Sequence, residues 1–166
     1  EVDYLVEPDV FHDFFGHLPI ISDPVFADFL QLYGERGLEA EKRGAVKYLA
    51  RLYWYTVEFG LIRRAGELKA FGAGILSSAG ETPYSVEHAD PLRVKFDRER
   101  IMRTNYLIDD YQTTYFVIDE FDELFAALDT LDIDAFLKAE ATKPEIGVGQ
   151  RIEFDTLIAP NPARTA

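Results

Sequence analysis

The sequence predicts a mainly helical fold with small β elements. Most segments with a clear apolar pattern begin at a helix-capping residue or end at a glycine. Only residues 113–118 have the β-branched and aromatic composition of a good strand. The chain has 166 residues, of which 48% are hydrophobic and 14% aromatic. It can therefore bury a core, and we expect one domain over residues 1–166.

The first helix is expected to be short. The chain should be extended up to Pro8, and Asp9 is a favourable N-cap for a helix that follows. We expect this helix to end at Gly16, because Pro19 disfavours helical geometry in the residue before it. His17 would then be free to turn back toward the helix.

A second helix is predicted from its start signal, residues 22–24. Ser-Asp-Pro supplies a capping side chain followed by proline at the first helical position. The apolar pattern continues through Tyr33, and we expect the helix to stop near Gly34 or Gly37.

A long central helix is expected over about Ala45–Ala65. Its apolar residues are too numerous for a narrow stripe, which indicates a position in the middle of the fold. Gly66 is a natural residue for its C-terminal end. The small, apolar stretch at 71–81 predicts a segment whose backbone closely approaches another part of the molecule.

The remaining elements are shorter. After an irregular connection at 90–92, we expect a helix over about 97–103 and, beyond the strand, a helix or helix pair over 121–139. The tail shows a weak strand at 151–154 and is expected to be frayed at 160–162.

Composition excludes several classes of function. The formal net charge is −13, which disfavours binding to nucleic acids and to anionic membrane surfaces. No apolar run is long enough to span a bilayer. The chain has no cysteine, so thiolate metal sites are excluded, and the composition fits a cytoplasmic protein. The first residues lack an initiator methionine and the features of a signal peptide, so we expect Glu1 to be the cut edge of something longer.

Two of the three histidines, His12 and His17, lie in one short aromatic segment. Two histidines and one carboxylate form the facial triad of non-haem Fe(II) sites, and Glu58 is the candidate carboxylate. On a continuous α-helix the two histidines would lie about 140° apart. We therefore expect the helix break at Gly16 to bring them together.

Glu58 is predicted to lie on an apolar helical face. Its neighbours three and four positions away are aromatic or aliphatic, namely Trp54, Tyr55, Leu61 and Ile62. An unpaired carboxylate there would cost several kcal/mol, on the order of the burial penalties of isolated charges. A metal ion held by the two histidines would supply the missing positive charge.

Other interpretations stay open at this point. The histidines could be satisfied core residues, and Glu58 could pair with an arginine. A zinc hydrolase could use the same three ligands, although the spacing differs from that of zinc metalloproteases, and Asp13 stands where those enzymes carry glutamate. His88, in a polar loop, is expected to be an exposed bystander.

Three blocks of sequence resemble the pterin-dependent aromatic amino acid hydroxylase family, and within it the bacterial-type phenylalanine hydroxylases. The blocks are Glu-Pro-Asp-Val-Phe-His-Asp through Gly-His-Leu-Pro at 7–19, Leu-Tyr-Trp with Thr-Val-Glu-Phe-Gly-Leu at 52–61, and Gly-Ala-Gly-Ile-Leu-Ser-Ser with Gly-Glu at 72–81. Their order and spacing also match, and the resemblance covers nearly the whole chain.

The resemblance implies a mostly α-helical catalytic domain with an Fe(II) site. The implied metal ligands are His12, His17 and Glu58, and Tyr53 resembles the tyrosine beside the iron-bound water. The implied roles are pterin contacts for Asp13 and Ala50, substrate-pocket positions for Pro8, Asp9, Trp54, Phe59 and Gly74, and a hydrogen bond that orients His12 for Ser77.

The implied activity is hydroxylation of L-phenylalanine to L-tyrosine with O2, Fe(II) and tetrahydrobiopterin or a related tetrahydropterin. Ile108 falls where the tyrosine-hydroxylating members tend to carry an acidic residue, so an aliphatic side chain there favours a bare phenyl ring. Tryptophan or tyrosine hydroxylation and a metal-binding fragment without turnover are the alternatives. A monomer is expected from the family. The pterin platform and the arginine that clamps the substrate carboxylate would belong to a segment before this chain, and Asp9 resembles that arginine's partner.

Overall fold

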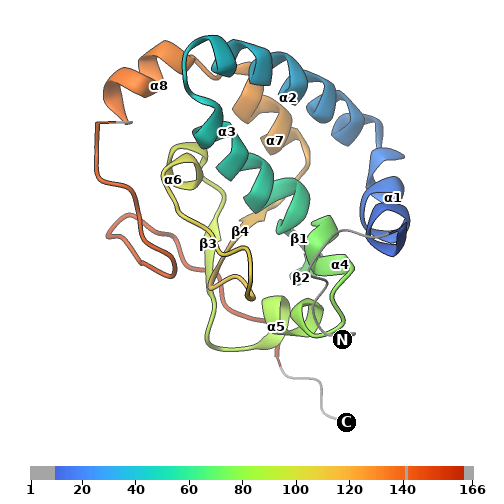
Figure 1. The fold of residues 1–166 in the computed structure, drawn as a ribbon. Coiled ribbons are helices and arrows are strands. Elements are labelled where there is room, and N and C mark those ends of the chain that lie inside the picture. Colours follow the sequence, from blue (N-terminus) through green and yellow to red (C-terminus); the bar gives the residue numbers. More distant parts are fainter. Residues whose placement is uncertain (1–9, 141, 163–166) are drawn as a thin grey trace.

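The computed structural model describes residues 10–140 and 142–162 (Figure 1). Helices dominate, and two of them are π-helical turns. The elements in chain order are η1 (His12–His17), α1 (Leu18–Ile21), α2 (Pro24–Lys42), α3 (Val46–Tyr53), η2 (Trp54–Glu58), β1 (Leu61–Arg64), β2 (Glu67–Ala70), α4 (Ala73–Leu76), α5 (Glu81–Glu87), β3 (Leu92–Lys95), α6 (Arg98–Met102), β4 (Thr114–Ile118), α7 (Asp122–Asp129) and α8 (Ile133–Ala139).

A four-stranded mixed sheet lies within the helices, in the order β2-β1-β4-β3. β1 and β2 form an antiparallel hairpin, whereas β4 runs parallel to both of its neighbours, β1 and β3. The connection from β3 to β4 carries α6, as parallel strands require a crossover. A helical core with small β elements is therefore present, although the sheet is larger than the sequence indicates.

β4 is buried on both faces and divides the core in two. Phe116 and Ile118 join the larger apolar cluster with side chains from α2, α3, α6, α7 and α8. Tyr115 and Val117 point to the smaller cluster, which includes residues of β1, β2, α4 and α5. A strand covered on both sides is continuously apolar, which explains why this strand was predictable from its sequence.

The N-terminal helix does not end at Gly16, so that expectation is wrong. Helical backbone continues from η1 through α1 to Ile21. A Cβ on Gly16 would lie 2.8 Å from the Cβ of Ala73. The glycine therefore serves the close packing of η1 against α4 and does not terminate the helix. Asp9, the expected N-cap, lies outside the described residues.

α2 begins where the sequence predicts and ends later. The Asp23 side chain accepts hydrogen bonds from the backbone N–H groups of Val25 and Phe26, as an N-cap should. Gly34 and Gly37 are internal to the helix and face open space. Each glycine costs about 1 kcal/mol relative to alanine, and the apolar face that α2 packs into the core offsets that cost.

The expected helix over Ala45–Ala65 is shorter than predicted. It ends with η2 at Glu58, and β1 occupies the last part of the range. A Cβ on Gly60 would lie 2.2 Å from the Phe71 ring, so the chain needs glycine where it leaves the helix. Ala65 and Gly66 both have positive φ values and form the β1–β2 turn, so Gly66 is a hairpin glycine and not a helix end.

The later helices were predicted correctly, and the tail was not. α6 follows an Asp97 cap, and α7 and α8 form the expected pair. Residues 151–154 form no strand; isolated bridges on either side of them join Ile146 to Thr104 and Leu157 to Val94. Asn161 is not frayed, because its side chain bonds both the N–H and the C=O of Leu68. The strands β1, β2 and β3 were missed.

None of the described helices combines the length and the apolarity required to cross a bilayer.

Candidate metal centre

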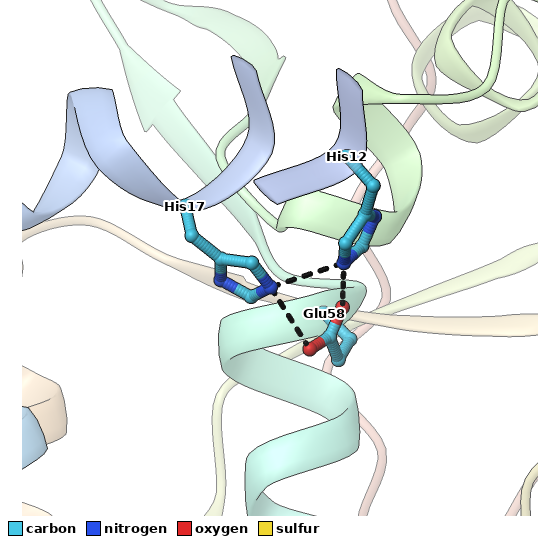
Figure 2. Close-up of side chains that lie close together, drawn as sticks. All are labelled: His12, His17 and Glu58. Carbon is cyan, nitrogen blue, oxygen red and sulfur yellow. Dashed lines mark hydrogen bonds and ion pairs between the residues drawn. The ribbon is translucent and has the colours of Figure 1, made fainter. Parts of the chain in front are cut away.

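Three side chains from two segments converge on one point (Figure 2). His12 and His17 come from η1, and Glu58 comes from the end of η2. The two histidine Nε2 atoms are 3.0 Å apart. The two carboxylate oxygens of Glu58 divide between them, with Oε2 3.6 Å from His12 and Oε1 3.5 Å from His17. The sequence thus identified three residues that the fold brings together.

π-Helical geometry explains how histidines five residues apart can share a face. In η1 the Leu18 N–H bonds the Asp13 carbonyl, an i to i+5 bond that widens the turn. The residue five positions along is therefore stacked over the first. The break expected at Gly16 is unnecessary, because the wider turn itself aligns His12 with His17.

Glu58 is also positioned by a π turn. The Phe59 N–H bonds the Trp54 carbonyl 2.8 Å away, again across five residues. Within this turn the Thr56 hydroxyl bonds the Leu52 carbonyl, a local bond that competes with regular helix geometry. Such turns are rare overall, and those that occur often lie at functional sites.

Ser77 fixes the orientation of His12. Its hydroxyl lies 2.8 Å from His12 Nδ1 and 2.7 Å from the Ala73 carbonyl. A carbonyl only accepts, so the single hydroxyl proton goes to Ala73, and the hydroxyl oxygen accepts from His12 Nδ1–H. Nε2 of His12 is then the ring nitrogen with a lone pair, and it points toward His17 and Glu58.

The carboxylate of Glu58 is held away from water. Burial raises the pKa of Glu58 to about 7; a hydrogen bond from the Gly74 backbone works against this shift, and the charge of Asp13 adds to it. Burial also lowers the pKa of His17, assisted by His12 and opposed by Asp13. Both shifts disfavour the charged forms, as desolvation does.

No arginine or lysine within 10–140 and 142–162 forms an ion pair with Glu58. Arg63 and Arg64, the nearest cations in sequence, pair with Asp119 and Glu120 at the surface. Within the described residues, therefore, no arginine neutralises Glu58, contrary to that alternative interpretation. Its only ionic partners there are the two histidines.

The donor set fits a single divalent ion. Donors about 2.1 Å from a metal and at right angles to one another lie roughly 3 Å apart. The three observed separations, 3.0, 3.5 and 3.6 Å, are close to that spacing. Two imidazoles and one carboxylate on one face leave the opposite positions of an octahedral ion open.

A cavity of about 540 Å³ opens beside the triad. Its wall is mostly aromatic and aliphatic, with a few polar groups, which is typical of sites for small organic molecules. The lining residues are His12, Tyr33, Ala50, Tyr53, Trp54, Glu58, Phe59, Gly74, Ser77, Ser78, Glu81, Tyr106 and Ile108.

Most of the predicted pocket residues lie in this wall, including Ala50, Tyr53, Trp54, Phe59 and Gly74. Gly74 is there because a Cβ would lie 2.7 Å from the Phe59 ring and 3.0 Å from the Glu58 carbonyl. The expected close approach of the 71–81 segment is thus to the backbone that carries the Glu58 carboxylate.

Two predicted residues of the described part of the chain, His17 and Asp13, are not among those that line the cavity. Asp13 is exposed and outside the cavity wall, although its charge acts on His17 and Glu58. Pro8 and Asp9 lie outside the described residues. The roles assigned to all the predicted site residues stay predictions.

Four lining residues were not found from the sequence, namely Tyr33, Ser78, Glu81 and Tyr106. Tyr33 comes from α2, and Tyr106 comes from a loop more than 50 positions beyond Trp54. Only the tertiary fold brings these segments together, so no local pattern reveals them. Glu81 was visible as a carboxylate in an apolar stretch, and that was the one available sign.

His88 behaves as expected. Its side chain is 55% exposed and approaches Asp90 at 3.4 Å, away from the triad.

Comparison with known protein families adds an independent finding. Residues 1–134 match the model of the biopterin-dependent aromatic amino acid hydroxylases. The phenylalanine-4-hydroxylase of Ralstonia nicotianae is 51% identical over 158 residues, which are 95% of this chain and 50% of that protein. The phenylalanine-4-hydroxylase of Chromobacterium violaceum is 58% identical over 127 residues, which are 76% of this chain and 43% of that protein.

Solved structures give the same result. The crystal structure of Chromobacterium violaceum phenylalanine hydroxylase bound to cobalt superposes with a TM-score of 0.90 at 50% identity, covering 94% of this chain and 56% of that one. The chain spans about half the length of the curated relatives that it matches.

Proposed function

The chain belongs to the biopterin-dependent aromatic amino acid hydroxylase family, and from this premise we propose that it acts in Fe(II)- and tetrahydropterin-dependent hydroxylation of L-phenylalanine to L-tyrosine. One observation carries the proposal: the donor atoms of His12, His17 and Glu58 all lie within 4.8 Å of one another, and His12 and Glu58 line an apolar cavity. The names of the relatives support phenylalanine as the substrate.

Each residue of the site has a proposed task. His12, His17 and Glu58 hold Fe(II), and Ser77 keeps the Nε2 lone pair of His12 directed at the metal. When bound, iron and tetrahydropterin supply the activation of O2, which the protein's own side chains cannot perform. Tyr53 contributes its hydroxyl beside Glu58, whose charge assists burial in raising the tyrosine pKa and so keeping the phenol protonated.

The cavity wall is proposed to orient the aromatic ring and to exclude water. Trp54 and Phe59 present flat apolar surfaces, and Ile108 offers no partner for a phenol hydroxyl. A wall of this kind favours phenylalanine over tyrosine, because the extra hydroxyl would be buried without a hydrogen bond. Ala50 and Asp13 are proposed to face the pterin, and Pro8, Asp9 and Gly74 the substrate.

Several further expectations belong to the same proposal. We propose that residues 1–166 form one domain, because β4 contributes side chains to both core clusters. We also propose a monomeric, cytoplasmic protein that binds no nucleic acid and no membrane surface, which the net charge of −13 supports.

The decisive test is an anaerobic Fe(II) titration of the chain beside Glu58→Ala. Wild type should bind one equivalent, and Glu58→Ala should lose more than about a hundredfold in affinity, since removal of outer groups alone costs about 10–100-fold. His88→Ala is the matched control, a histidine outside the triad that should leave binding unchanged. Equal binding by Glu58→Ala would refute the metal site.

Turnover is tested separately, by tyrosine formation from L-phenylalanine with added tetrahydropterin under air. Product that depends on both iron and pterin would support the hydroxylase. Tight iron binding without product would favour the alternative of a metal-binding unit that does not turn over by itself. Comparison with L-tryptophan and L-tyrosine as substrates tests the choice of amino acid.

A further inference from the structure

Three aromatic rings stand in a row at the cavity wall. The Trp54 ring centroid is 4.5 Å from that of Tyr106, with the planes 20° apart, and 4.8 Å from that of Phe59. All three residues line the cavity beside Glu58. Trp54 and Phe59 flank the metal ligand in sequence, whereas Tyr106 reaches them from the loop at 105–112.

The orientation of the Trp54 indole depends on these rings. Its Nε1 is buried and has no hydrogen-bond partner among the residues that the structure describes. A donor without an acceptor does not fix the ring, so packing against Tyr106 and Phe59 has to do so. Of these two rings, only Tyr106 stacks on the indole at a low interplanar angle.

The loop is clamped immediately before Tyr106. The Asn105 side-chain oxygen accepts from Arg51 at 2.5 Å, and its backbone carbonyl accepts from the Tyr55 hydroxyl at 2.6 Å. Its N–H bonds the Ile146 carbonyl at 2.9 Å. The polar groups of Asn105 are thereby tied to Arg51 of α3, to Tyr55 of η2 and to the C-terminal segment.

A second clamp holds the loop after Tyr106. The Gln112 side chain accepts from the Leu107 N–H and donates to the Leu107 carbonyl, at 3.2 and 2.8 Å. Gln112 is itself held, because its backbone N–H donates to Glu81 Oε1, which also accepts from the Tyr115 hydroxyl. Glu81, only 1% exposed, thus anchors the far end of the loop.

We infer that Tyr106 is a positioning residue, which fixes the Trp54 indole as a preset wall beside the metal centre. It acts on the substrate through Trp54, and the two clamps hold its ring in place before any ligand binds. The part of this inference that concerns the substrate rests on the proposed function; the part that concerns the indole does not.

The test uses Trp54 as its own reporter, because it is the only tryptophan of the chain. We compare wild type with Tyr106→Leu, which removes the ring, and Tyr106→Phe, which keeps it. Acrylamide quenching of metal-free protein should rise about twofold in Tyr106→Leu, since one of two covering rings is lost, and should stay unchanged in Tyr106→Phe.

Equal quenching in all three proteins would overturn the inference. If Tyr106→Leu does not fold, as judged by circular dichroism, Asn105→Ala replaces it, because that variant releases the first clamp and keeps the ring. Quenching of Asn105→Ala should then exceed that of wild type, and unchanged quenching counts against the inference.

Kinetics distinguish positioning from mere structural support. In Tyr106→Leu the KM for L-phenylalanine should rise by up to about tenfold with a smaller change in kcat, and Tyr106→Phe should restore wild-type KM. Failure of the wild-type chain to bind iron would refute the proposed function, but the quenching result would still stand. Changed quenching with an unchanged KM would overturn the part that concerns the substrate.

Discussion

Two largely buried carboxylates, Glu58 and Asp155, are handled in opposite ways. Asp155 receives two hydrogen bonds from Arg100, at 2.8 and 3.3 Å, and one from the Ile152 N–H. Arg100 also bonds Thr104 and the Gln150 carbonyl. Charge and hydrogen-bonding capacity are thus satisfied within the protein, and this pair ties the C-terminal segment to α6.

Among the residues that the structure describes, Glu58 has no such partner. Its neighbours are the imidazoles of His12 and His17, burial lowers the pKa of His17, and Glu58 lies at the wall of a cavity. The two sites teach a practical distinction. A buried charge that the chain neutralises itself is structural, whereas one left incomplete beside a cavity indicates a ligand that completes it.

The largest effect should come from breaking the structural pair. Asp155→Ala leaves Arg100 buried without its counter-charge and should lower the free energy of unfolding by about 3–5 kcal/mol. Urea denaturation followed by circular dichroism measures this change. Asp90→Ala, at an exposed position, is the control and should change stability little.

Glu58→Gln sharpens the same comparison, because it should not destabilise the metal-free protein. It removes a carboxylate that burial already disfavours and keeps its shape. Destabilisation as large as that of Asp155→Ala would mean that Glu58 is part of a self-sufficient ionic site, and the distinction between the two carboxylates would fail.

Ser77→Ala should have the next largest effect, and it should change only the affinity for the metal ion. Without the hydroxyl, His12 Nδ1 loses the acceptor that fixes its tautomer, and Fe(II) affinity should fall about 10–100-fold. An anaerobic titration checks this. Ser22→Ala, which removes an exposed hydroxyl on the Pro19 carbonyl, should bind as wild type does; an equal loss there would point to a general effect on folding.

The smallest effect concerns Glu81, whose environment is intermediate between those of Asp155 and Glu58. It accepts two hydrogen bonds from neutral donors and, in the part of the chain that the structure describes, has no ion pair. Burial raises its pKa, opposed by the bonds from Tyr115 and Gln112. The folded state therefore holds a proton that the unfolded chain has released above pH 4.5.

Stability should consequently fall as pH rises from that value through the folded pKa, by at most about 1.4 kcal/mol per pH unit. Glu81→Gln keeps the acceptor oxygen and removes the titration. Urea unfolding at pH 5, 6, 7 and 8 should give a steeper decline for wild type than for the variant. Parallel curves would show that Glu81 does not titrate in this range.

The candidate metal-binding residues were predictable, because side chains that can bind a metal are recognised directly in the sequence. Histidines in an aromatic segment and a carboxylate among apolar neighbours indicated His12, His17 and Glu58 before any fold was known. How they meet was not predictable, since a π turn depends on packing such as that of Gly16 against Ala73. Tyr106 was missed for a related reason, because the fold alone brings it to Trp54.

The fold was predictable where local signals are unambiguous. Asp23 and Asp97 cap helices as expected, and β4 is a strand because both of its faces are apolar and buried. Glycine was the misleading residue. Gly16 lies at a tight contact and Gly66 in a hairpin turn, whereas Gly34 and Gly37 lie inside α2 with neither role. These cases differ only in long-range contacts, which a single sequence does not specify.

The wide turn in η1 can also be viewed as one surplus residue in a helix. Removing a residue between His12 and His17 would restore ordinary α-helical spacing and would still leave the two rings on one side. Val10 and Phe11, which precede His12 in the same helix, would however rotate by about 100° around the helix axis. The length of this short stretch therefore sets the angle at which these two residues stand to the triad, and a one-residue deletion there would move them while the two histidines still shared one face.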